Sequence, residues 1–155
     1  MIVQEFFSSD NKEHWIREIK KCDWGAGKWL AELLERQKLE ETVGKGAQVP
    51  MLTDGDSLVS FCTFAPLDEI QPTELCPWIG FVYTFPQYRG HRYVGMLLEW
   101  CEGAAASMGR ENVYISTDHC GLYEKYGYHF LNEQTTIYGE KTRVYYKPVL
   151  LSTKL

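Results

Sequence analysis

The chain has 155 residues, of which 45% are hydrophobic and 24% charged, and its formal net charge at pH 7 is −5. These proportions are typical of one soluble globular domain over residues 1–155, and they exclude a disordered or fibrous protein. The acidic balance argues against nucleic acid or an anionic membrane as the main partner and favours a basic or small polar substrate.

The cysteines and the N-terminus restrict the compartment that we expect. The chain contains five cysteines: Cys22, Cys62, Cys76, Cys101 and Cys120. Their odd number and the lack of CxxC or Cys/His ligand spacing predict neither a disulfide framework nor a metal site, and reduced thiols favour the cytoplasm. Because no basic segment precedes a long apolar run and no apolar stretch reaches 18 residues, we expect neither an export signal nor a membrane span.

The first part of the chain predicts two strands around two short helices. Residues 1–7 are apolar enough for a strand, and the Ser8-Ser9-Asp10 cluster predicts the N-cap of a helix over 11–21. Residues 22–27 contain two glycines and predict a break before a second helix over 28–39. A loop over 44–48 then leads to a strand over 49–53.

The next segments predict the middle of a sheet. Asp54-Gly55-Asp56 predicts a hairpin turn into a strand over 58–65, and a polar loop with three prolines follows at 66–77. Residues 78–85 are almost continuously apolar, as expected of a central strand that is buried on both faces.

The second half predicts a crossover helix and three more strands. The helix continues to about residue 108 and stops at Gly109, with one apolar stripe made of Val94, Leu97, Leu98, Cys101, Ala105 and Met108. A strand over 112–116 would pair in parallel with 78–85 through a right-handed crossover. Thr117 or Asp118 can cap a short helix that runs to about 126 and ends at Gly127; strands follow within 128–138 and over 142–149, with a turn at 139–141.

The turn between strand 78–85 and the helix predicts an anion site. It reads Pro86-Gln87-Tyr88-Arg89-Gly90-His91-Arg92-Tyr93-Val94-Gly95, and no Asp or Glu occurs between Leu75 and Leu98. A strand that ends at a helix N-terminus leaves several backbone N–H groups unpaired, and the helix dipole adds partial positive charge there. The local charge fits a phosphate.

Two familiar nucleotide motifs do not fit this turn. Gly90 and Gly95 have the spacing of a Walker A loop, but Met96 and Leu97 stand where Lys and Ser/Thr would bind the terminal phosphate and magnesium. A dinucleotide fingerprint would need a third glycine. We therefore expect neither phosphoryl transfer nor a dinucleotide site.

Two motifs make the chain resemble the GCN5-related N-acetyltransferase (GNAT) superfamily over most of its length, most strongly over 78–130. The turn that begins at Pro86 resembles the family's Pro-x-Tyr-Arg-Gly turn, whose backbone amides hold the pyrophosphate of acetyl-CoA. The later motif Tyr123-Glu124-Lys125-Tyr126-Gly127-Tyr128 resembles the family's Tyr-Glu-Lys-x-Gly-Phe signature. The chain departs from the family at Arg92 and Val94, which fill the two small positions of the pattern Gln/Arg-x-x-Gly-x-Gly/Ala.

The resemblance implies a fold and a cofactor. The fold would be a GNAT-type α/β domain with a mixed, mostly antiparallel sheet of six or seven strands, splayed between strands 4 and 5, and helices on both faces. Acetyl-CoA would enter the splay, and its thioester oxygen would meet a backbone N–H of the strand. The expected cofactor-binding residues are Phe81, Val82, Tyr83, Thr84, Tyr88, Arg89, Gly90, His91, Arg92, Tyr93, Val94, Gly95, Ser116 and Tyr123.

The resemblance also implies a general acid. Tyr123 corresponds to the tyrosine whose hydroxyl protonates the departing CoA thiolate, and a phenol is suited to stabilise a thiolate as it leaves. For the base that deprotonates the amine, Asp118 and His119 precede Tyr123 and are the candidates. For Cys120 we expect a buried structural thiol rather than an acyl-carrying nucleophile.

Acceptor binding is expected in two irregular segments. Residues 22–27 hold Asp23 and Trp24, and the loop over 66–77 holds Asp68, Glu69 and Glu74. Aromatic and acidic side chains together suit an ammonium group, with Trp24, Asp23 and Glu69 as the candidates.

The function expected from this sequence is transfer of acetyl from acetyl-CoA to an amine of a small molecule or peptide, by direct attack in a ternary complex. One alternative keeps an acyltransferase but uses another acyl-CoA or a hydroxyl acceptor. The other is a non-catalytic acyl-CoA-binding regulatory domain. No metal is expected; a homodimer is common among similar proteins, and the acceptor's identity is open.

Overall fold

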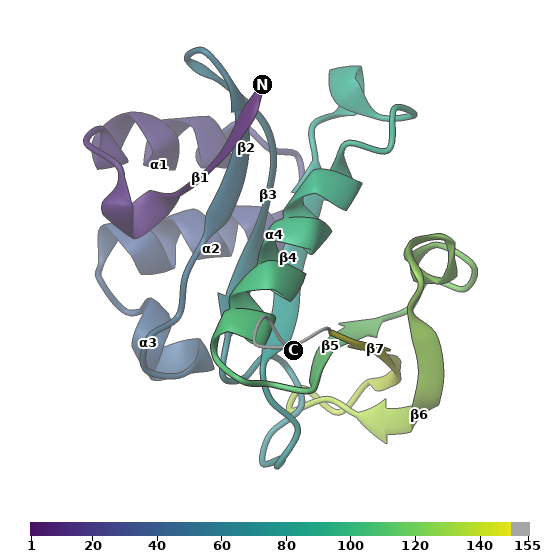
Figure 1. The fold of residues 1–155 in the computed structure, drawn as a ribbon. Helices are drawn as coiled ribbons and strands as arrows, with labels where there is room; N and C mark the ends of the chain where they lie inside the picture. Colours follow the sequence, from purple (N-terminus) through teal and green to yellow (C-terminus); the bar gives the residue numbers. More distant parts are fainter. Residues whose placement is uncertain (150–155) are drawn as a thin grey trace.

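The computed structural model describes residues 1–149, and residues 150–155 of the expected domain lie outside the described part. Seven strands form one sheet in the order β1-β2-β3-β4-β5-β7-β6 (Figure 1). The strands are β1 (Ile2–Glu5), β2 (Pro50–Asp54), β3 (Ser57–Ala65), β4 (Trp78–Thr84), β5 (Asn112–Thr117), β6 (His129–Thr135) and β7 (Lys141–Pro148). The α-helices are α1 (Lys12–Lys20), α2 (Gly25–Glu35), α3 (Leu39–Val43) and α4 (Val94–Ser107), and the 3₁₀ turns are η1 (Phe6–Ser8), η2 (Pro86–Tyr88) and η3 (Tyr123–Tyr126).

The sheet is mostly antiparallel, and its only parallel pair among the described strands is β4 with β5. These two strands pair only through Trp78 with Tyr114 and Ile79 with Ile115. Beyond Ile79 they separate, while β4 continues to pair with β3 and β5 with β7. The expected sheet, splayed between its fourth and fifth strands, is confirmed.

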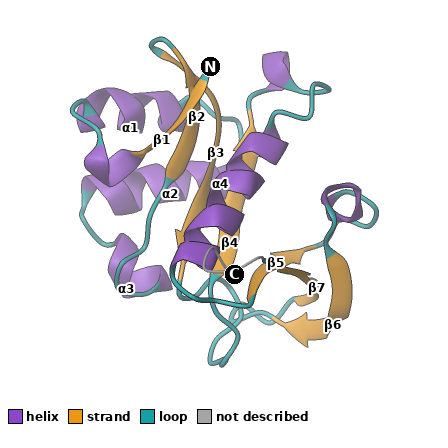
Figure 2. Cartoon of the chain, in the orientation of Figure 1, coloured by secondary structure: helices purple, strands orange, loops and turns teal. Residues whose placement is uncertain are grey.

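Helices cover both faces of the sheet, as Figures 1 and 2 show. On one face α1 and α2 pack on the sheet through a core that includes Trp15, Ile19 and Leu30. On the other face α4 packs through Leu97, Leu98 and Cys101. Within residues 1–149, none of the helices has the length and apolar character needed to cross a membrane.

Two expectations about the first helices are wrong. A break does separate α1 from α2, but it ends before Gly25, so α2 begins three residues earlier than expected; α3 is an additional helix. Gly27 lies inside α2 and against Cys22 and Phe61, where an added Cβ would overlap the Cys22 Sγ. This glycine therefore permits close packing instead of a turn.

The start of the chain also differs from the expectation. The first strand ends at Glu5, and the Ser9 hydroxyl donates to the carbonyl of Phe6 in η1 at 2.6 Å. Asn11 stands at the N-cap of α1 without a side-chain capping bond. Ser9 is thus used by η1, so it does not cap the helix.

Two details of the second half are corrected as well. Met108 is 57% exposed and does not belong to the buried stripe of α4, although Gly109 ends this helix with a φ of 77° as expected. The Thr117 hydroxyl accepts from the His119 amide at 3.1 Å in a local turn, and helical structure begins only at Tyr123, as a 3₁₀ turn.

Candidate active site

The separation of β4 from β5 opens a cleft of about 1130 Å³ that is lined from both faces of the sheet. From the α4 side it is lined by Val82, Val94 and Tyr123, and from the α2 side by Trp24 and Phe81. The first two residues of β4 pair in parallel with Tyr114 and Ile115 of β5, so the cleft widens toward the carboxyl ends of the strands, where ligands bind in open α/β sheets.

The edge of β4 in this cleft is irregular. The pairing register between β3 and β4 shifts between Phe61 and Thr63, and Phe81 has a φ of 51°. A non-glycine residue in this region is rare and marks a bulge that re-aims backbone groups. The bulge lies beside the point where β5 departs, so β4 presents peptide groups to the cleft that are not used by a sheet neighbour.

The turn from Arg89 to Tyr93 connects η2 to α4, and its backbone N–H groups after Arg89 lack hydrogen-bond acceptors within the described residues. None of the amides from Gly90 to Val94 donates a hydrogen bond to residues 1–149. Arg92 has a φ of 59°, in the left-handed region that favours glycine. The backbone therefore adopts the glycine conformation at Arg92, one of the positions where the family pattern has a small residue.

The two arginines of this turn contact the protein. The Arg89 Nε donates to the Thr84 carbonyl at 2.8 Å, and its guanidinium lies over the Tyr83 ring at 5.2 Å. The Arg92 guanidinium lies 5.2 Å from the centre of the Tyr126 ring and donates to the Lys125 carbonyl at 3.3 Å. Arg92 therefore joins the turn to η3.

Tyr123 of η3 lines the cleft and is 5% exposed. Burial raises the pKa of its phenol, and the nearby Cys62, Tyr126 and Asp68 raise it further. Tyr123 therefore stays protonated at neutral pH and is able to donate a proton or a hydrogen bond.

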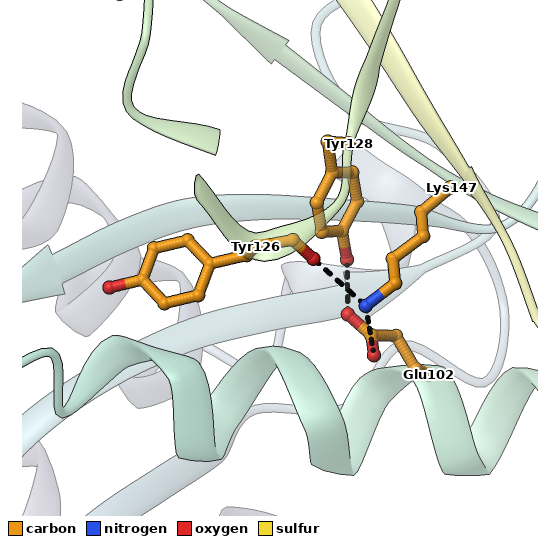
Figure 3. Close-up of polar contacts among 4 residues, drawn as sticks. All are labelled: Glu102, Tyr126, Tyr128 and Lys147. Atoms are coloured by element: carbon orange, nitrogen blue, oxygen red, sulfur yellow. Dashed lines mark hydrogen bonds and ion pairs between the residues drawn. The ribbon is translucent and has the colours of Figure 1, made fainter. Parts of the chain in front are cut away.

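The end of η3 is held by a half-buried polar network, shown in Figure 3. The Tyr128 hydroxyl donates to Glu102 of α4 at 2.9 Å, and Lys147 of β7 donates to the other oxygen of Glu102 at 3.0 Å. The same ammonium donates to the Tyr126 carbonyl at 2.9 Å. Tyr128, which stands where the family signature has Phe, uses its hydroxyl to tie the segment after Tyr123 to α4.

The α2 side of the cleft is aromatic and acidic. The Trp24 ring stacks on Tyr83 with 5.8 Å between ring centroids, and the Tyr83 hydroxyl donates to Asp23 at 2.6 Å. That hydrogen bond lowers the pKa of the Asp23 carboxyl and thus keeps it charged. Trp29 of α2 packs near Phe81 and also lines the cleft, as does Tyr138 from the turn between β6 and β7.

Two acidic residues of the loop over 66–77 reach the cleft. Glu69 accepts from the Ser116 hydroxyl of β5 at 2.6 Å, and Asp68 lies against Gly80 of β4, where an added Cβ would overlap its carboxylate. Glu74, the third acidic residue of this loop, is exposed and does not line the cleft.

The first candidates for a base also line the cleft. Asp118 and His119 follow β5 and are exposed. Cys120 is exposed too, so the expectation of a buried thiol is wrong. The residue lies in the segment between β5 and η3.

The structure brings together many, but not all, of the residues expected at the site. The expected residues that line the cleft are Asp23, Trp24, Glu69, Phe81, Val82, Tyr83, Thr84, Arg89, Val94, Ser116, Asp118, His119 and Tyr123. The expected residues outside its lining are Tyr88, Gly90, His91, Arg92, Tyr93 and Gly95, which form or flank the turn at one end. Trp29, Asp68 and Tyr138 line the cleft without having been candidates; Gly80, an isolated glycine in an apolar strand, is the sequence signal for a close approach there.

A splayed mixed sheet with a bulged fourth strand, free amides before α4 and a buried tyrosine in the cleft defines the class of acyl-CoA-dependent transferases with the GNAT fold. The sequence agrees with this class, because residues 8–128 match the family described as "Acetyltransferase (GNAT) family". The chain belongs to this family, whose members use acetyl-CoA. The cofactor expected from the sequence is confirmed at this level.

Solved structures show the same fold at low sequence identity. An aminoglycoside 6′-N-acetyltransferase complexed with coenzyme A superposes with a TM-score of 0.72 and 17% identity over 99% of this chain and 100% of its own. An aminoglycoside 6′-acetyltransferase of type Ii superposes with a TM-score of 0.68 and 19% identity, over 97% of this chain and 98% of its own. For the aminoglycoside 6′-N-acetyltransferase from Enterococcus faecium the TM-score is 0.71 and the identity 17%, over 99% of this chain and 100% of the other. No curated protein sequence matches the chain.

Proposed function

We propose that the protein transfers an acetyl group from acetyl-CoA directly to a cationic amine inside the cleft. The observation that carries this proposal is the lining of the cleft from both faces of the sheet, which would let donor and acceptor enter from opposite sides and meet inside it. Direct transfer needs such an arrangement, because both substrates must be bound at once with their reacting atoms in contact.

The donor half would be formed by β4, the turn and Tyr123. Free amides from Gly90 to Val94 suit the pyrophosphate of CoA, and the unpaired edge of β4 after Ile79 suits its amide-bearing arm. The thioester supplies the acyl group, and Tyr123 would give its proton to the sulfur as the C–S bond breaks. The residues therefore fit the cofactor of the family.

The acceptor half would be formed on the α2 side. Asp23, kept charged by Tyr83, and the rings of Trp24 and Trp29 suit an ammonium group through ion-pair and cation–π contacts. The negative net charge of −5 favours the approach of cationic molecules. Aminoglycosides, the acceptors named for the structural neighbours, are polycationic amines and head the list of acceptors to test.

The experiment measures thiol release from acetyl-CoA by the purified protein with aminoglycosides, polyamines, amino acids and peptides as acceptors. We expect amine-dependent release, and we expect acetyl-CoA at about 100 times its Kd to stabilise the protein by about 2.7 kcal/mol, a rise in Tm of several degrees. If acetyl-CoA does not raise the Tm, the cofactor assignment is wrong for this chain. Stabilisation without release for any amine would favour a non-catalytic acyl-CoA-binding domain, and release only with alcohols or other acyl-CoA molecules would favour a different acyltransferase.

A further inference from the structure

Strand β4 carries no acidic side chain, but a carboxylate lies against it. The three heavy atoms nearest to a Cβ added at Gly80 all belong to the Asp68 side chain, and the Cβ would overlap them. Asp68 therefore occupies the space that a side chain at position 80 would fill. This space adjoins the bulge at Phe81 and the end of the β4–β5 pairing at Ile79, where the donor and acceptor halves of the cleft meet.

The backbone on both sides of Asp68 is anchored to the rest of the protein. The Leu67 amide donates to the carbonyl of Val43, the last residue of α3, at 2.9 Å, and the Ile137 amide donates to the Glu69 carbonyl at 2.9 Å. The Gln71 side chain donates to the Asp68 carbonyl at 2.8 Å. The loop is thus fixed at the point where it delivers this carboxylate.

No cation faces the Asp68 carboxylate among the described residues. The titratable groups around it are Glu69, Tyr123 and Tyr138, none of which is positively charged. Burial and the charge of Glu69 raise the pKa of Asp68 to about 7. Glu69 differs from Asp68 because it accepts the Ser116 hydroxyl, so its carboxylate is already engaged.

We propose that Asp68 is the group that accepts the proton of the acceptor amine. This inference rests on the proposed acetyl transfer. The ammonium group gives one proton to the Asp68 carboxylate, its nitrogen then bonds to the thioester carbon, and the C–S bond breaks while the sulfur takes the Tyr123 proton. The second proton that leaves the nitrogen restores the Tyr123 phenol, and Asp68 passes its proton to water, so charge and atoms balance.

The pH dependence of kcat tests this assignment. A base must be unprotonated, so kcat of the unmodified protein should rise with pH through about 7 and level off above it. Asp68→Asn keeps the size and polarity of the side chain; we expect it to lower kcat about 100-fold and to abolish this rise. The affinity for acetyl-CoA, measured by calorimetry, should stay within about twofold, and Asp56→Asn in the exposed turn after β2 is the matched control.

The same measurement distinguishes Asp68 from the other candidate bases. If the rise near pH 7 survives in Asp68→Asn and disappears in Asp118→Asn or His119→Gln, the inference is overturned. An active protein whose Asp68→Asn variant keeps kcat overturns it as well, whereas a protein that transfers acetyl to no amine contradicts the proposed function instead.

A second variant tests whether the place of the carboxylate matters, whichever residue supplies it. With Asp68→Ala, the space beside position 80 is empty, and the added Gly80→Glu can place a carboxylate there from β4 itself. We expect Asp68→Ala/Gly80→Glu to recover at least about tenfold of the kcat lost in Asp68→Ala. If the double variant folds, binds acetyl-CoA and recovers nothing, a carboxylate at this place is not the proton acceptor.

Discussion

At the scale of single residues, the state of Tyr123 follows from its surroundings. The ring packs edge-to-face on Tyr128 with centroids 6.1 Å apart, and its hydroxyl has no hydrogen-bond partner among residues 1–149. A phenol with a raised pKa and no partner inside the protein is free to donate to a group that enters the cleft. Packing thus fixes the ring and leaves the hydroxyl without a partner among the described residues.

We therefore predict that Tyr123→Phe lowers kcat about 100-fold with little effect on the KM for acetyl-CoA, because only the donor is removed. The Tm should change little, since the ring and its packing remain. Tyr146→Phe in β7, outside the cleft lining, is the matched control. An unchanged kcat in steady-state kinetics of Tyr123→Phe would show that this hydroxyl is not the general acid.

Single residues of the cleft differ in how well the sequence alone predicts them. Tyr123 stands in a contiguous motif, so its place in the cleft could be expected from the residues beside it. Asp68 could not be distinguished from Glu74 in the same loop, because its contact with Gly80 depends on anchors at Val43 and Ile137, in distant segments of the chain. Tertiary contacts of this kind leave no local pattern.

At the scale of elements, the turn before α4 keeps its shape without the family's small residues. Arg92 takes a left-handed conformation, and its guanidinium reaches Tyr126 and Lys125 of η3. Gly95 allows this approach, because an added Cβ would come within 3.1 Å of the Tyr126 ring. The turn and the element that carries Tyr123 are therefore packed as one unit.

We predict that Arg92→Ala is less stable than Arg92→Gly by about 1 kcal/mol in urea unfolding. Both variants lose the contacts of the guanidinium, so their difference reports the cost of a left-handed conformation for a residue with a Cβ. The same pair of substitutions at the exposed His91, whose φ is not positive, should give the opposite order or no difference. An Arg92→Ala variant as stable as Arg92→Gly would mean that the turn does not need this conformation.

At the scale of the whole molecule, the hydrophobic pattern of the sequence is enough to predict the central strands of the sheet, but it does not predict every helix boundary. The apolar run over 78–85 correctly indicated a central strand, and the helix and strand after it correctly indicated the parallel pair. The pattern puts the start of α2 too late, because Gly25 and Gly27 resemble helix breakers, whereas Gly27 lies inside the helix and packs against Cys22 and Phe61. A glycine in the sequence can end a helix or allow close packing inside one, and only tertiary contacts distinguish the two cases.

Even in the absence of substrate, the free energy of unfolding of the whole protein should depend on the charge of Asp68. Because the folded state raises the pKa of this carboxyl from 3.8 to about 7, it binds the proton more tightly than the unfolded chain. This contribution to stability is fully present below about pH 4 and is lost as the pH rises to about 7. Asp23 and Glu124, whose pKa values are lowered, act in the opposite direction in every variant.

We therefore predict that Asp68→Asn gains stability relative to the unmodified protein as the pH rises from about 4 to about 8. A shift of this size, discounted for partial exposure of the side chain, corresponds to about 2 kcal/mol. The measurement is the free energy of unfolding in urea at several pH values, with Asp56→Asn as a variant whose difference should stay constant. A constant difference for Asp68→Asn would mean that this carboxylate is solvated like a surface group, and the cleft would then lack the environment that a base near neutral pH requires.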